Sequence, residues 1–107
     1  MTTSPFRQEI ELLQNYSKHK TFTYTTPADT DAHDVVSLTG VMVECNKVSF
    51  IVENADAYIE FDSDATTSSM LIPANEGYFD DSIWIGIKIS IKAVSGQPRI
   101  RGILWGR

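Results

Sequence analysis

Residues 83–92 read Ile-Trp-Ile-Gly-Ile-Lys-Ile-Ser-Ile-Lys, and this stretch decides the fold class. Isoleucine stands at every second position and alternates with Trp84, Gly86, Lys88, Ser90 and Lys92. Successive side chains of an extended strand point to opposite faces, so the alternation predicts that all the isoleucines share one face. Isoleucine is branched at its β-carbon and favours the pleated surface. We therefore predict a long strand over 83–92 whose isoleucine face lines the core.

Other short segments of the chain show the same alternation between turn signals. Residues 48–53 and 57–61 alternate, and the apolar residues 70–72 precede Pro73. Asn46-Lys47 is predicted to close a tight hairpin between the apolar runs 41–45 and 48–53. About seven or eight short strands with regular turns predict an all-β fold, an antiparallel β-sandwich or jelly roll.

The first residues of the chain follow a helical spacing instead. Ser4 and Pro5 suit the cap and first position of a helix, and Phe6, Ile10 and Leu13 then recur on one face. A short isolated helix is marginally stable, so this face needs a surface to bury against. We predict a helical arm over 1–20, a β-sandwich domain over 21–107, and binding of the three apolar residues to a partner chain.

Composition bounds the protein class. A chain of 107 residues is expected to form one compact unit. Its single cysteine, Cys45, allows no internal disulfide and is predicted to pack as a small hydrophobe, in keeping with assembly in a reducing cytoplasm. The first residues lack the pattern of a signal peptide, and no apolar run is long enough to cross a membrane. We therefore expect no membrane partner.

Charge is divided unevenly along the chain. Residues 1–20 carry a net charge of +1, residues 21–81 carry −11, and residues 82–107 carry +5 without any acid. One explanation is internal, because cross-strand pairs can neutralise basic strands beside acidic ones. The other is complementarity with a partner or sister subunit, since interfaces favour tryptophan and arginine. On this second explanation, the predicted partner-binding surface contains Trp84, Lys88, Lys92, Arg99 and Arg101.

Residues with catalytic or ligand chemistry show no complete motif. Asp62-Ser-Asp-Ala-Thr begins like a calcium loop, but Thr67 replaces the required glycine and Pro73 the closing glutamate. A second acidic segment, 29–34, is better explained as a solvated loop. The sequence contains no nucleophile elbow and no glycine-rich phosphate loop. We therefore expect no catalytic residue, no metal, no cofactor and no enzymatic activity, and the acidic net charge argues against nucleic acid.

The aromatic residues leave an alternative function open. Trp84, Tyr58, Tyr78 and Trp105 are candidates for an aromatic platform that binds a sugar. Trp84 alternates with the isoleucines, and a fully exposed tryptophan on the opposite face is unusual. The alternative prediction is therefore a carbohydrate-binding β-sandwich module.

Three stretches carry a resemblance to a known class of proteins. Asp-Ala-Tyr-Ile-Glu-Phe-Asp at 56–62, Ser-Ser-Met-Leu-Ile-Pro at 68–73 and Arg-Gly-Ile-Leu-Trp at 101–105 resemble small β-sandwich virion proteins of tailed bacteriophages. The resemblance covers roughly residues 35–107 and implies a structural role, as a capsid decoration or cement protein or as a tail or fibre component. It implies the major capsid protein or other virion proteins as partners, a homo-oligomer, and a place in the virion after assembly in the host cytoplasm.

Overall fold

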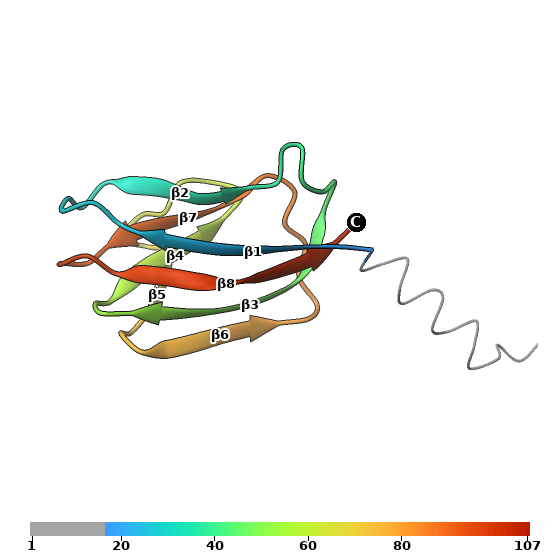
Figure 1. Cartoon of the computed structure of the whole chain (residues 1–107). Helices are drawn as coiled ribbons and strands as arrows, with labels where there is room; N and C mark the ends of the chain where they lie inside the picture. Colours follow the sequence, from blue (N-terminus) through green and yellow to red (C-terminus); the bar gives the residue numbers. More distant parts are fainter. Residues whose placement is uncertain (1–16) are drawn as a thin grey trace, which may run out of the picture.

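The computed structural model describes residues 17–107, which form two four-stranded antiparallel sheets packed face to face (Figure 1). Sheet A has the order β1 (Lys18–Thr25), β8 (Arg99–Gly106), β3 (Cys45–Glu53) and β6 (Glu76–Asp80). Sheet B has the order β2 (Ala32–Ser37), β7 (Lys88–Ala93), β4 (Ala57–Phe61) and β5 (Met70–Ile72). The predicted all-β sandwich with jelly-roll character is confirmed. Residues 17–107 contain no helix, and so no helix that could cross a membrane.

The predicted helical arm falls mostly outside the described residues. Residues 1–16 are not described, and the chain enters sheet A at Lys18. The end of the range predicted as an arm, residues 18–20, therefore belongs to the first strand.

The core lies between the two sheets and consists of alternate residues from their central strands. In β3 these are Val48, Phe50 and Val52, and in β8 they are Ile100 and Leu104. Strands β7 and β4 of sheet B supply the opposite wall of the core. Each of these large side chains stabilises the fold by about 1.5–3 kcal/mol through its burial. The period-two pattern of the sequence thus identifies most of the core.

The predicted strand over 83–92 is correct only in its second half. Ile89 and Ile91 are fully buried in β7, which begins at Lys88. Ile85 is also buried, but it forms an isolated bridge with Cys45 at the start of a sheet A strand. Ile87, between the two halves, is 56% exposed. The prediction that every isoleucine of the run lies on the core face is therefore wrong for Ile87.

A bend held by Asp62 explains the exposed isoleucine. The backbone N–H groups of Gly86, Ile87 and Lys88 all donate to its carboxylate, at 3.1, 2.7 and 3.2 Å from Oδ1. Three successive N–H groups cannot converge on one carboxylate in a straight strand, because alternate N–H groups of a strand point in opposite directions. The run therefore passes from a partner in sheet A to partners in sheet B, and the alternation breaks at the bend.

The predicted hairpin at Asn46-Lys47 is also wrong. Strand β3 runs without a turn from Cys45 to Glu53, and a register shift between Cys45 and Lys47 accommodates Asn46. The preceding residues, predicted as a strand over 41–45, form a loop instead. The N–H groups of Val41 and Met42 donate to the carbonyl of Leu38, at 2.9 and 3.1 Å. Local turn bonds thus replace the strand pairing that the apolar composition indicated.

Candidate functional site

The predicted partner surface is divided between the two sheets. Lys88 and Lys92 lie on β7 in sheet B, whereas Arg99 and Arg101 lie on β8 in sheet A. Their neighbours along each strand point into the common core, so the two pairs point outward on opposite faces of the sandwich. Trp84 lies in the loop before β7. The structure thus does not bring these residues onto one surface, and three further predicted residues lie outside the described chain: Phe6, Ile10 and Leu13.

Most of the positive charge of the last two strands is paired within the molecule. Lys88 Nζ lies 2.8 Å from Asp34 Oδ1 and 2.5 Å from Asp64 Oδ1. The bond to Asp34, followed by that to Asp64, raises the pKa of Lys88. Arg101 Nε lies 2.9 Å from a carboxylate oxygen of Glu53 on the neighbouring strand. This pairing supports the internal explanation of the uneven charge.

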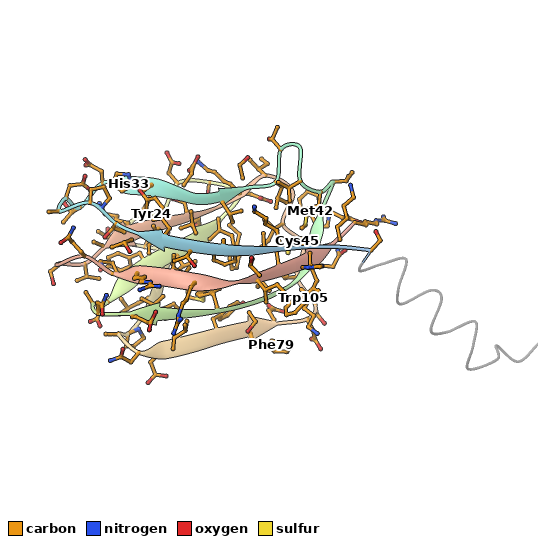
Figure 2. The ribbon with its side chains drawn as sticks, in the orientation of Figure 1. Tyr24, His33, Met42, Cys45, Phe79 and Trp105 are labelled. Atoms are coloured by element: carbon orange, nitrogen blue, oxygen red, sulfur yellow. The ribbon has the colours of Figure 1, made fainter. Side chains whose placement is uncertain are left out.

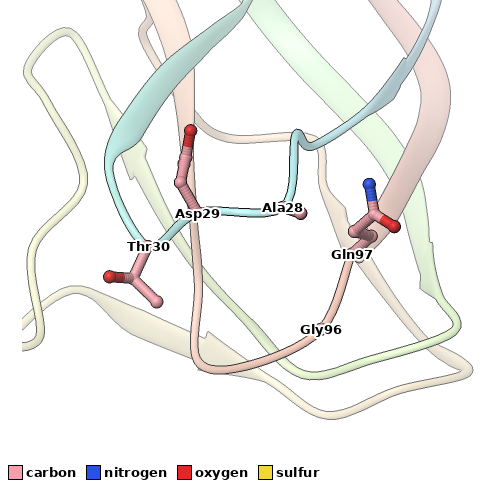
Figure 3. Close-up of a pocket in the computed structure, with 5 residues that line it drawn as sticks. All are labelled: Ala28, Asp29, Thr30, Gly96 and Gln97. Atoms are coloured by element: carbon pink, nitrogen blue, oxygen red, sulfur yellow. The ribbon is translucent and has the colours of Figure 1, made fainter.

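The acidic segment at 29–34 is predicted as a loop, but its last three residues begin β2; its first residues border a shallow pocket (Figure 3). The pocket has a volume of about 280 Å³ and is lined by Ala28, Asp29, Thr30, Gly96 and Gln97. Asp29 Oδ1 lies 2.8 Å from His33 Nε2 and accepts the N–H of Asp31 at 3.0 Å. The bond to His33, then that to the Asp31 N–H, lowers the pKa of Asp29. The only charged group of this pocket is therefore engaged in holding its own loop.

Asp62, the first residue of the calcium-like stretch, has a structural role. Its carboxylate holds the bend at residues 86–88 described above. The loop that follows Asp62 is fixed to β7 by a separate bond, in which the N–H of Ala65 donates to Ser90 Oγ at 2.9 Å. Across residues 17–107, no group of three or more histidine, cysteine, aspartate or glutamate side chains is placed to hold a metal ion.

Exposed apolar side chains gather in the loops at one end of the sandwich. We call Val43, Trp84 and Ile87 the loop-end surface; they are 78%, 62% and 56% exposed. Their loops are joined by backbone bonds: the Val43 N–H donates to the Arg107 carbonyl at 2.6 Å, and the Leu38 N–H donates to the Ile87 carbonyl at 2.8 Å. The apolar groups therefore stand on loops that are held in place.

Trp84 is positioned by three neighbours. Its indole Nε1–H donates to Glu44 Oε2 at 2.6 Å, and the other oxygen of Glu44 accepts a bond from Arg107 Nε. The bonds from Trp84 and then Arg107 lower the pKa of Glu44. The ring lies over Gly86, where a β-carbon would collide with it. Trp84 therefore exposes a broad apolar ring in one defined orientation.

A second apolar surface covers the outer side of sheet A. We call Ile51, Phe79, Ile103 and Trp105 the aromatic face; Figure 2 shows Phe79 and Trp105 on neighbouring parts of this sheet. Lys47 Nζ stands 4.6 Å from the Trp105 ring centroid and 5.6 Å from that of Phe79. Sequence analysis missed this face. The signal for it is that 103–105 is apolar on both sides of the strand, although an outer sheet face open to water is expected to be polar.

The rings proposed for a sugar platform do not gather. Tyr78 packs on Phe50 and Phe61, with centroid distances of 5.4 and 6.1 Å, and its hydroxyl donates to Asp80. Tyr58 lies on β4 in sheet B, and Trp105 on the outer face of sheet A. Trp84 is thus the member of the set that stands largely exposed in the loops.

Comparisons with known proteins do not identify a family for this chain. No family model matches the sequence, and no curated protein matches it significantly. Among solved structures, the chain is similar to the crystal structure of a cupin-2 domain containing protein from Shewanella frigidimarina NCIMB 400. The two are 14% identical over 94% of this chain and 92% of that chain, with a TM-score of 0.44. A likeness at this level carries no functional argument.

Proposed function

We propose that this protein is a structural binding module, not an enzyme, and that it attaches to another protein chain through the loop-end surface. The observation that carries the proposal is the exposure of Trp84 and Val43 on loops fixed by backbone bonds. Interfaces place their strongest contacts on aromatic anchors, and a rigid anchor loses little conformational freedom on binding. The exposed apolar side chains of the loop-end surface are therefore better explained as a binding surface than as scattered surface residues without a role.

The bonding of the ionisable groups supports a structural role. Asp62 holds a backbone bend, Asp29 pairs with His33, and Glu44 holds Trp84. A catalytic acid, base or nucleophile has to face a cleft in which a substrate fits. Asp29 lines the shallow pocket, but all three carboxylates are bonded to the protein's own backbone and side chains.

The finer proposal is a virion structural protein, most specifically a capsid decoration or cement protein that binds and stabilises major capsid subunits. It is supported by the resemblance of residues 56–62, 68–73 and 101–105 to small virion proteins of tailed bacteriophages. Within this fold, those residues belong to β4, β5 and β8 and their connections. The proposed partner is the major capsid protein or another virion protein, and the proposed location is the virion.

Co-sedimentation with purified capsids of the virus whose genome encodes the chain tests this proposal. Wild-type protein is expected to bind, and Trp84→Ala to bind at least about tenfold more weakly, because loss of an aromatic anchor at an interface typically costs about 2 kcal/mol or more. Leu71→Ala, which truncates an exposed apolar side chain in sheet B, is the matched control and should bind like wild type. Failure of the wild type to bind would refute the assignment as a capsid decoration or cement protein.

A glycan array with the same variants tests the carbohydrate-binding alternative. The exposed ring of Trp84 is the observation that favours it, since sugars stack on such rings. Glycan binding that Trp84→Ala abolishes, together with no binding to capsids, would replace the proposed function by this alternative.

A further inference from the structure

Sheet A ends at two edge strands that carry opposite charge. Strands β1 and β6 lie at opposite sides of this sheet, and among residues 17–107 each pairs with one neighbouring strand, β8 and β3 respectively (Figure 1). We propose that β6 of one copy of this chain pairs with β1 of the next copy, so that sheet A continues from molecule to molecule. This inference concerns the edges of the sheet and stands independently of the loop-end surface and of the proposed function.

The two edges are complementary in charge. Residues 18–20, Lys-His-Lys, are exposed at the start of β1, and this strand contains no acid. Strand β6 begins with Glu76, ends with Asp80 and contains no base. Asp80 accepts bonds from the Tyr78 hydroxyl and the Ser82 N–H, at 3.0 and 2.9 Å, and neither donor carries a charge. Within residues 17–107, no salt bridge engages the lysines of β1 or the acids of β6, so the charge of both edges is left for a partner.

The strand directions allow the sheet to continue. All neighbouring strands of sheet A are antiparallel, so β1 and β6, its first and fourth strands, run in opposite directions. A second copy in the same orientation therefore brings its β1 antiparallel to β6. At a given level of the sheet, hydrogen-bonded and non-bonded pairs alternate from strand to strand, because the N–H and C=O of one residue point to the same neighbour. With four strands in the sheet, this alternation continues from β6 into the next β1 without a shift of register.

The unshifted register places favourable residues opposite each other. Through their partners in β8 and β3, Lys20 and Asp80 lie at one level of sheet A. Thr21 and Phe79 lie at the next level by the same pairing. Lys20 therefore faces Asp80 of the neighbouring copy, and Thr21 faces the ring of Phe79, which is 59% exposed. Opposite charges, and an aromatic beside a β-branched residue, are both stabilising cross-strand pairs.

Charge also selects against pairing between two like edges. Symmetric antiparallel pairing of β6 with itself about Tyr78 places Glu76 opposite Asp80 at both ends, and like charges directly opposite are destabilising. A contact between two β1 strands gives their lysines no acid to face. Lysine on an edge strand discourages indiscriminate pairing, whereas an acidic edge turns the same lysines into attractive contacts. The contact is therefore head to tail, and its repetition forms a ring or an open chain.

Sedimentation equilibrium of the full chain at low salt tests the proposal. The average mass of wild type should rise with protein concentration. Lys20→Glu and Asp80→Lys should each raise the dissociation constant about fivefold or more, because one attractive pair in each contact becomes repulsive. Asp80→Asn is a second β6 variant that retains the acceptor oxygen and should weaken association less. Lys92→Glu and Glu60→Lys make the same changes of charge on the central strands of sheet B and should associate like wild type. Thermal unfolding followed by circular dichroism verifies that each variant is folded.

Mixing the two charge-reversed chains distinguishes the β1–β6 contact from other modes of association. In an equimolar mixture, the β1 edge of Lys20→Glu meets the β6 edge of Asp80→Lys, and the other two edges are those of wild type. Both kinds of contact are then attractive, so the mixture should associate more tightly than either chain alone. Hydrogen exchange of wild type should show slower exchange of β1 and β6 amides at high than at low protein concentration.

Each measurement has a result that would overturn the proposal. These results are a wild type that stays monomeric, unchanged association of both charge-reversed variants, a mixture that associates no better than its folded components, and edge amides whose exchange does not depend on concentration. Because the experiments contain this chain alone, their outcomes are separate from those for the proposed function.

Discussion

Removal of the Asp62 carboxylate tests the physical reason for the broken isoleucine pattern. Asp62 has a φ of 67°, a left-handed conformation that glycine adopts without strain. The substitution Asp62→Gly therefore deletes the carboxylate and preserves the backbone conformation. Asn54→Gly is the matched control, because Asn54 has a φ of 75° and also lies in a turn after a strand of the sandwich.

The expected magnitude follows from the three bonds to residues 86–88. A hydrogen bond to a charged group contributes about 1.5–3 kcal/mol, but water can replace part of this at Ile87, which is exposed. We therefore expect Asp62→Gly to lower the free energy of unfolding by about 2–4 kcal/mol, less than the simple sum of three charged bonds. For a domain of this size, that corresponds to a decrease in melting temperature of roughly 10–25 °C.

Urea unfolding followed by circular dichroism measures the free energy, and hydrogen exchange measures the bend directly. The amides of Gly86, Ile87 and Lys88 should exchange much faster in Asp62→Gly than in wild type, because they lose their acceptor. Asn54→Gly should be within about 0.5 kcal/mol of wild type. If Asp62→Gly is as stable as Asn54→Gly, the carboxylate does not hold the bend and our explanation of the exposed Ile87 fails.

Three other predictions follow from burial and bonding. Ile89→Asp should abolish cooperative unfolding, because it places a charge in the core, whereas Ile87→Asp should melt within a few degrees of wild type; the reverse order would invalidate the placement of the bend. The pKa of Glu44 is lowered in the folded protein, so its carboxylate stabilises the fold at pH values above its ordinary pKa near 4.5, and this stabilisation is lost as the pH falls through the lowered pKa. The decrease in melting temperature from pH 5 to pH 3 should therefore be smaller in Glu44→Gln than in wild type. An equal decrease in the two proteins would contradict this prediction. Burial raises the pKa of Cys45, so a thiol reagent at pH 8 should label it only after denaturation, and rapid labelling of the folded protein would show that the site is open.

The sequence predicts those parts of the fold in which local pattern and tertiary pairing agree. In residues 48–53 and 57–61 every second residue is apolar, and each segment lies in a strand with one face in the core. The pattern fails at 83–92 because Asp62, more than twenty positions away, accepts the N–H groups of the bend. Nothing within the isoleucine run itself signals this bond. The predicted hairpin at Asn46-Lys47 is wrong because β-bulges and tight turns favour similar residues. The local sequence therefore does not distinguish the bulge that the structure contains from the predicted turn.

The candidate surfaces were predictable only in part. The exposure of Trp84 follows from its alternation with buried isoleucines, but its bond to Glu44 joins positions 40 apart in the sequence. The charge asymmetry suggested one basic surface, yet β7 and β8 enter different sheets and turn their cations to opposite sides. The assignment of strands to sheets thus decides which residues share a face, and it depends on the order of all strands.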